Sequence, residues 1–232
     1  MRQLTAIALL LLAILTMPCM HSTAFAELDA DKSFETDIKE FLPNQIDKGL
    51  ELAKRYIAME RFDLAERFYK TMFDSKPIDW RVYYYYSDFL IRLNRIKEAV
   101  EVLETCTEER GISAYDIHIT LGALYFRDQN YRKSAREYKR AASVNHIYPE
   151  PLFYWAVSAI FQGLEGEPTE AIQTMEKRFP GSPYLAFAKA VYAYYSGKFE
   201  EADALVATIT DDSTMPAFYH VFRSALDRKS VV

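Results

Sequence analysis

Two stretches of this sequence repeat each other at a fixed spacing. Residues 61–69 read RFDLAERFY and residues 95–103 read RIKEAVEVL, and the two align without a gap, so that Ala65 and Ala99 are 34 residues apart. A third copy, NYRKSAREY at residues 130–138, follows after 35 residues, with serine in the place of the alanine. A period of this length is typical of a pair of antiparallel helices, each too thin to bury its own apolar face, so neighbouring pairs must stack. The sequence therefore predicts an array of helix pairs whose function depends on its surface.

The composition is that of a folded, acidic protein. Of the 232 residues, 50% are hydrophobic and 15% are aromatic, which is too apolar for a disordered chain. The net charge is -5, whereas nucleic-acid binding depends on clustered lysine and arginine with little opposing charge. The 7 glycines leave little room for phosphate-binding loops, and the alternation of β-branched residues that would indicate a sheet is absent. We therefore expect an all-α protein that does not bind nucleic acid.

The N-terminus has the pattern of a secretory signal peptide. Arg2 precedes an apolar segment from Leu4 to Met17, and Ala24-Phe25-Ala26 forms the small-x-small pattern that signal peptidase recognises. We predict a signal peptide over residues 1–26 that is cleaved before Glu27. The mature protein would then be exported, either to the periplasm or out of the cell.

Two other interpretations of the N-terminus are less consistent with its sequence. An uncleaved membrane anchor is less consistent with an apolar segment shorter than the roughly 20 residues that span a bilayer. A lipoprotein attached through Cys19 is disfavoured, because Thr16-Met17-Pro18 lacks the small residues of a lipobox. No later segment is long and apolar enough to span a membrane, so we expect no integral membrane segment after cleavage.

The pattern of small and large residues resembles that of the tetratricopeptide repeat family. Three successive units carry it, at residues 46–79, 80–113 and 115–148. The matching residues are Leu52, Ala53, Tyr56, Phe62, Ala65, Tyr69 and Pro77 in the first unit, Tyr83, Tyr86, Ser87, Leu90, Ile96, Ala99, Leu103 and Cys106 in the second, and Leu121, Gly122, Tyr125, Tyr131, Ser134, Tyr138 and Ala141 in the third. Weaker matches continue to about Pro216. The resemblance implies an all-α solenoid of about five helix-turn-helix repeats.

Helices are also expected on both sides of the array. Residues 33–42 place Phe34, Ile38, Phe41 and Leu42 on one helical face, and residues 216–229 carry a second apolar stripe. Because terminal repeats need a cap, we interpret both helices as caps, although the Phe34 stripe could instead dock onto a partner. The predicted domains are a signal peptide at 1–26, an acidic N-terminal segment with a capping helix at 27–44, and a superhelical repeat domain at 45–232.

The sequence offers no set of residues for catalysis or metal binding. None of His118, His146 and His220 has another histidine or a cysteine at the spacing of metal ligands on one helix. His118 falls on a packing position of its unit, so we expect a structural role. Cys106 is the single cysteine beyond the predicted signal peptide, and we expect a buried thiol without a disulfide. The sequence thus predicts a protein that is not an enzyme and needs no metal or cofactor.

Aromatic and arginine side chains recur at positions that, by the resemblance, line the concave groove of the solenoid. Exposed apolar strips commonly mark binding sites, and tyrosine provides a large contact area at a low cost in entropy. The alternative is that these rings pack against one another in a tightly curled array. The predicted groove residues are Tyr84, Tyr85, Arg92, Phe126, Arg127, Phe153 and Tyr154.

Two functions compete on these observations. The first is a protein-protein interaction scaffold of the cell envelope that binds a polypeptide of unknown identity in the aromatic groove. The second is a structural subunit of a larger envelope, secretion or assembly complex, docked by its ends or by its convex face. A size measurement on cell extract would separate the two functions, because a permanent subunit co-purifies with its complex at a fixed stoichiometry.

Overall fold

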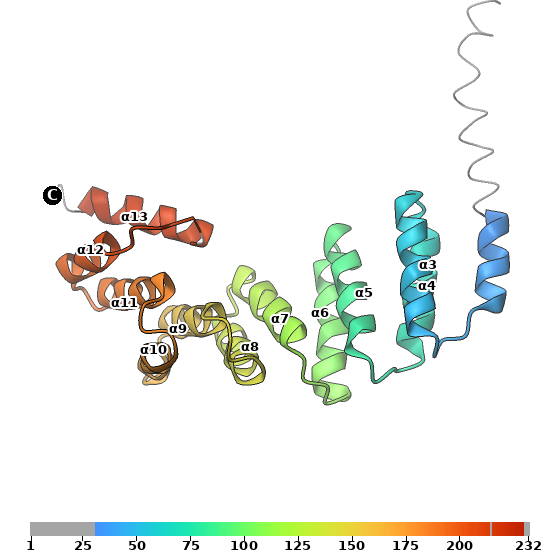
Figure 1. The fold of residues 1–232 in the computed structure, drawn as a ribbon, viewed down its shortest axis with the longest axis horizontal. Coiled ribbons are helices and arrows are strands. Elements are labelled where there is room, and N and C mark those ends of the chain that lie inside the picture. Colours follow the sequence, from blue (N-terminus) through green and yellow to red (C-terminus); the bar gives the residue numbers. More distant parts are fainter. Residues whose placement is uncertain (1–30, 214, 230–232) are drawn as a thin grey trace, which may run out of the picture. The chain divides into compact units, whose positions relative to one another are not determined.

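The computed structural model describes residues 31–213 and 215–229, with the side chains described up to residue 226. The predicted signal peptide and its cleavage site lie outside this range. Contacts divide the chain into two compact units that meet between Tyr86 and Ser87, within one helix, and we describe each unit by itself. Every regular element in the described part is a helix (Figure 1).

The first unit contains a helix at residues 31–40, then α3 (Ile46–Ala58), α4 (Phe62–Asp74) and the beginning of α5 (Trp80–Arg92). Helices α3 and α4 pack side by side (Figure 1). Phe34 is 1% exposed, and its ring contacts Tyr56 at 5.6 Å and Phe68 at 5.4 Å. Phe34 and Phe41 are therefore buried inside their own unit and are not available for docking, whereas Leu42 is 56% exposed, so docking through this helix stays a prediction.

The second unit continues from α5 through α6 (Ile96–Glu104), a π-helical turn η1 (Thr105–Glu109), α7 (Tyr115–Arg127) and α8 (Tyr131–Val144). It goes on with α9 (Glu150–Gln162), α10 (Glu167–Arg178), α11 (Pro183–Tyr195), α12 (Phe199–Ala207) and α13 (Ala217–Lys229). From α6 to α13 each helix contacts the helix that follows it, as repeat arrays require. The predicted all-α solenoid is confirmed.

The turn inside each helix pair uses a left-handed backbone conformation. A residue with positive φ lies two positions before the second helix of the pair at Glu60, Asn94, Gln129 and Gly197, and four positions before it at Gly163. These positions follow the repeat period of the sequence. Glycine adopts this conformation without strain, whereas the other three side chains adopt it at some cost. The turn is therefore set by the geometry of the helix pair, even where glycine is missing.

The last helix covers the end of the second unit. Tyr219, Phe222 and Leu226 of α13 are buried, whereas Val221 is exposed. Phe187 on α11 contacts the rings of Tyr219 at 5.1 Å and Phe222 at 5.5 Å. The predicted C-terminal helix thus packs on the array as a cap would.

The small residues of the repeat lie where helices approach closely. Ala99 on α6 has no exposed surface, so a larger side chain has no room there. We expect Ala99→Leu to lower the free energy of unfolding by about 1–3 kcal/mol through overpacking. The control is Ala204→Leu at an exposed alanine of α12, which should change it by less than about 0.5 kcal/mol. Equal denaturation midpoints for the two variants would contradict this placement of Ala99.

Candidate binding groove

A groove of about 990 Å³ lies in the second unit, alongside α7. We call it the α7 groove. Its walls come from α7, α8, the connection between α8 and α9, the first turns of α9, and the beginning of α13. It is lined by Tyr115, Asp116, Ile119, Ala123, Phe126, Arg127, Tyr138, Asn145, Tyr148, Glu150, Tyr154, Pro216, Ala217 and Phe218.

Six of the fourteen residues that line the groove are aromatic, and most of their rings contact one another. Tyr154 stacks on Tyr138, with ring centroids 5.1 Å apart, and meets Phe126 edge-on at 6.4 Å. Tyr115 and Tyr148 lie 5.9 Å apart, and Tyr148 is 49% exposed. Pairs of this geometry add stability beyond the area that they bury. The groove is thus held in shape by its own rings, and Tyr148 leaves a large surface available for contact.

The acidic residues of the groove lie at one end, and its arginine lies at the other. Asp116 lies in the first turn of α7 and Glu150 in the first turn of α9, whereas Arg127 is the last residue of α7. Asp116 and Arg127 are separated by about 16 Å along the helix axis, from the rise of 1.5 Å per residue. The Oε2 atom of Glu150 is buried and accepts no hydrogen bond from the described residues. The groove therefore has an acidic end and a basic end.

The phenols near the acidic end keep their protons at neutral pH. Burial, with a contribution from the charge of Glu150, raises the pKa of Tyr115 to about 12. The same two causes raise the pKa of Tyr154 above its ordinary value. These hydroxyls can therefore donate hydrogen bonds to a ligand as well as accept them.

The structure brings three of the predicted groove residues together. Phe126, Arg127 and Tyr154 all line the α7 groove, and the first and last of them are half-buried. Tyr84 and Tyr85 belong to the first unit, where they are half-buried with ring centroids 5.4 Å apart. Their participation in a binding groove stays a prediction.

Two of the predicted residues have other roles. Phe153 has no exposed surface and stacks on Phe187 at 5.0 Å, so the prediction that it lines a groove is wrong. The reason is that α11 packs against that side of α9. Arg92 does not line the α7 groove and pairs with Asp88 one turn earlier on α5 at 2.8 Å.

Several residues of the groove were not found from the sequence. Tyr115 and Tyr148 lie at the two ends of the third predicted unit, outside the positions that the resemblance assigns to the groove. Glu150 was missed because a carboxylate in a first helical turn is common for electrostatic reasons alone. Phe218 comes from the final helix, and no sequence pattern indicates that α13 reaches the α7 groove.

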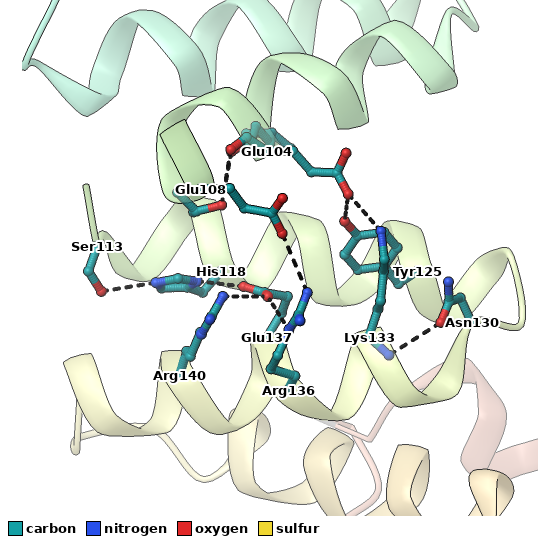
Figure 2. Close-up of polar contacts among 12 residues, drawn as sticks. Glu104, Glu108, Ser113, His118, Tyr125, Asn130, Lys133, Arg136, Glu137 and Arg140 are labelled. Carbon is teal, nitrogen blue, oxygen red and sulfur yellow. Dashed lines mark hydrogen bonds and ion pairs between the residues drawn. The ribbon is translucent and has the colours of Figure 1, made fainter. Parts of the chain in front are cut away.

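Beside the groove, a buried polar network joins α6, η1, α7 and α8 (Figure 2). His118 Nδ1 donates a hydrogen bond of 2.8 Å to Glu137, and His118 Nε2 lies 2.9 Å from Ser113 Oγ. Arg140 and Arg136 also donate to the Glu137 carboxylate, at 2.8 Å and 3.3 Å. His118 and Glu137 are only 3% and 1% exposed.

This network stabilises the fold and is not part of the binding groove. None of its residues lines the α7 groove. Burial of Glu137 alone would raise the pKa of its carboxyl, but the hydrogen bond from His118 and the nearby arginines together hold the pKa below its ordinary value. In a second cluster, the Glu104 carboxylate likewise accepts hydrogen bonds from neighbouring helices, one from the Tyr125 hydroxyl and one of 2.9 Å from Lys133 (Figure 2). The two clusters connect α6, α7 and α8.

The described part of the chain contains no reactive thiol, no cluster of metal ligands and no membrane-spanning helix. Cys106 has no exposed surface, and burial raises the pKa of its thiol to about 12, so the expected buried thiol is confirmed. Within residues 31–213 and 215–229, no three histidine, cysteine or acidic side chains gather as they would around a metal ion. In the same range, no helix combines the length and the apolar character needed to cross a bilayer.

Comparisons with known proteins agree with this architecture. A sequence model described as a tetratricopeptide repeat matches residues 50–108. No curated protein sequence matches the chain.

Several solved structures are similar in fold. One is a tetratricopeptide repeat protein from Parabacteroides merdae, with 12% identity, 78% of this chain and 71% of that chain covered, and a TM-score of 0.63. Another is YrrB, described as a TPR protein with an unusual peptide-binding site, with 17% identity, coverages of 83% and 97%, and a TM-score of 0.62. A third is MamA from Desulfovibrio magneticus, with 12% identity, coverages of 72% and 94%, and a TM-score of 0.56. At these identities the likeness concerns the fold. The match at residues 50–108 identifies tetratricopeptide repeats in this part of the chain, and the solved structures show that the chain shares the fold of tetratricopeptide repeat proteins.

Proposed function

We propose that this protein is a non-enzymatic scaffold that binds a polypeptide segment in the α7 groove. The observation that carries this proposal is a groove of about 990 Å³ that six aromatic side chains line, with Tyr148, Tyr154 and Phe126 at least partly exposed. Extended grooves on repeat arrays commonly bind polypeptides. The similar fold of YrrB, which is described as having a peptide-binding site, supports the same class of ligand.

The dimensions and chemistry of the groove suit a short extended segment. Helix α7 has 13 residues and is therefore about 20 Å long. At about 3.3 Å per residue, an extended polypeptide would place about six residues along it. Rings can receive apolar side chains, while Asn145 and the tyrosine hydroxyls can bond to the main chain of the ligand.

The test is a direct binding measurement with defined probes. Fluorescence anisotropy of the purified protein with a positional-scanning library of capped decapeptides should find sequences that bind with a Kd in the micromolar range. Tyr148→Ala should weaken the best binder about thirtyfold, as expected for loss of an aromatic anchor. Tyr192→Ala, at an exposed tyrosine outside the groove, is the matched control and should leave the Kd unchanged. Equal losses in both variants would argue against the α7 groove as the binding site.

The alternative of a structural subunit docked by its ends is less well supported. In the stripe that suggested a terminal docking surface, Phe34 is covered by Tyr56 and Phe68 of its own unit. The C-terminal helix likewise buries Tyr219, Phe222 and Leu226. Most of the aromatic side chains of both stripes are thus buried within the chain, although Leu42 and Val221 stay exposed, and this favours the groove as the functional surface.

We further propose that the scaffold acts in the cell envelope or outside the cell, on the residue pattern of positions 1–26 alone. The expected result is an exported mature protein that begins at Glu27 or within a residue or two of it. N-terminal sequencing of the protein from fractionated cells measures this directly. A chain that retains Met1 in the envelope fraction would contradict cleavage, and one that retains Met1 in the cytoplasm would contradict export.

A further inference from the structure

We propose that the α7 groove selects polypeptide segments that carry a basic side chain, lysine or arginine, and that this side chain lies at the acidic end of the groove with Glu150 as its counter-charge. This inference rests on the proposed function and specifies its ligand. It follows from the position of two carboxylates, from the rings that surround them and from the position of Arg127.

Glu150 is the first of these observations. Its side chain is half-buried and lines the groove, and its Oε2 atom is buried without a hydrogen bond from the described residues. A buried carboxylate oxygen without a donor is costly, and an ammonium or guanidinium group supplies the donors that it lacks. The first turn of α9 explains why a negative charge is tolerated at this position, but the amides of that turn leave Oε2 unbonded.

Asp116 and two tyrosines are the second observation. Asp116 is half-buried, lines the same groove and forms no ion pair with another described residue. Tyr115 and Tyr148, with centroids 5.9 Å apart, stand at the same end, because Tyr115 precedes Asp116 and Tyr148 precedes Glu150 by two positions. Aromatic faces attract cations, most strongly where water is excluded. Two carboxylates beside two aromatic rings make a site that favours a positive charge.

Arg127 is the third observation, because its charge determines in which orientation a charged segment would bind in the groove. It is exposed in the groove at the far end of α7, and it pairs with no acidic side chain in the described part of the chain. A ligand carboxylate would therefore be favoured at the end opposite to the basic side chain. The separation of about 16 Å between Asp116 and Arg127 corresponds to about five residues of an extended segment. A segment with a basic residue and an acidic residue about five positions apart matches the groove in one orientation.

The experiment is a specificity profile on matched variants. The same capped decapeptide library is bound to the wild-type protein, to Glu150→Gln and to Asp116→Asn, and the best binder is remeasured with its basic residue changed to norleucine. We expect enrichment of lysine or arginine at one position, and a loss of at least about tenfold in affinity in each carboxylate variant. With the norleucine peptide, Glu150→Gln should have almost no further effect, since the interacting charge is already absent. Glu165→Gln, which removes a charge outside the groove, should bind as the wild type does.

Each result has a distinct meaning. If peptides bind through the groove aromatics but show no preference for basic residues, or bind equally well to Glu150→Gln and Asp116→Asn, this inference is wrong and the proposed function stands. Enrichment of acidic residues at every position would also overturn it. If no peptide binds at all, the proposed function and this inference fail together. Thermal melting of each variant shows whether a loss of binding reflects unfolding, and Asp116→Asn decides the question if Glu150→Gln does not fold.

Discussion

Replacing Glu137 with alanine is expected to lower the free energy of unfolding by about 3–5 kcal/mol. The carboxylate is 1% exposed and accepts hydrogen bonds from His118, Arg140 and Arg136. Its removal leaves His118 Nδ1 buried without an acceptor and two arginines without their shared partner (Figure 2). Breaking a buried network in this way costs far more than its formation contributes, because the desolvation of the remaining groups is no longer offset.

The matched control for this prediction is Glu201→Ala. Glu201 also pairs with a basic residue, Lys198, at 3.3 Å, but both side chains are exposed. Pairs of this kind contribute about 0–1 kcal/mol. Chemical denaturation of the two variants should therefore separate them clearly. Similar midpoints would mean that the network is not buried as described.

The same network predicts how stability changes with pH. The pKa of Glu137 is lower in the folded protein than its ordinary value, through His118 and the arginines, which outweigh the effect of burial. Its contribution is therefore complete above the ordinary pKa of a glutamate and is lost as the pH falls through the lower, folded-state pKa. Denaturation curves between neutral and strongly acidic pH should show this loss in the wild type. The loss should be smaller in Glu137→Gln, and an unchanged slope would contradict the assignment.

The second large effect concerns adjacent aromatic residues with different roles. Phe153→Ala should lower the free energy of unfolding by about 3–5 kcal/mol, because the ring is fully buried between Phe187, at 5.0 Å, and Tyr184, at 5.4 Å. Tyr148→Ala, at a side chain that is 49% exposed, should change it by less than about 1 kcal/mol. Thermal or chemical denaturation of the two variants measures the difference.

Peptide affinity should be affected in the opposite order, with Tyr148→Ala losing more than Phe153→Ala. At a temperature where both variants are folded, Phe153→Ala should retain most of its peptide affinity, whereas Tyr148→Ala should lose about thirtyfold. A Tyr148→Ala protein that unfolds like Phe153→Ala would show that Tyr148 belongs to the core. In that case the available surface of the α7 groove would be much smaller than described.

The repeat architecture could be predicted because its signals are local. The 34-residue spacing of Ala65 and Ala99 and the large residues around them identify helix pairs without any knowledge of tertiary contacts. The buried state of Cys106 followed from the same register. The capping role of the helix at 31–40 was the simpler of two interpretations, and the contacts of Phe34 support it.

The groove could be predicted only in part, because the exposure of a ring depends on what packs against its helix. Phe153 and Tyr154 are neighbours on α9, and the pattern assigned both to the groove, but α11 covers Phe153 and leaves Tyr154 half-buried. Phe218 reaches the groove only through the position of α13, which no local pattern encodes. The buried Oε2 of Glu150 likewise becomes visible only once the surrounding helices are in place.

The central claim, that the α7 groove binds the polypeptide, can be tested most directly by filling the groove. Ala123 is exposed on α7 and lines the groove, so Ala123→Trp should occupy it without disturbing the core. Ala204→Trp, at an exposed alanine of α12 outside the groove, is the matched control. In fluorescence anisotropy with the best library peptide, Ala123→Trp should lose about thirtyfold or more in affinity while Ala204→Trp keeps the wild-type Kd, with both melting as the wild type does. Wild-type affinity in a folded Ala123→Trp protein would contradict the claim.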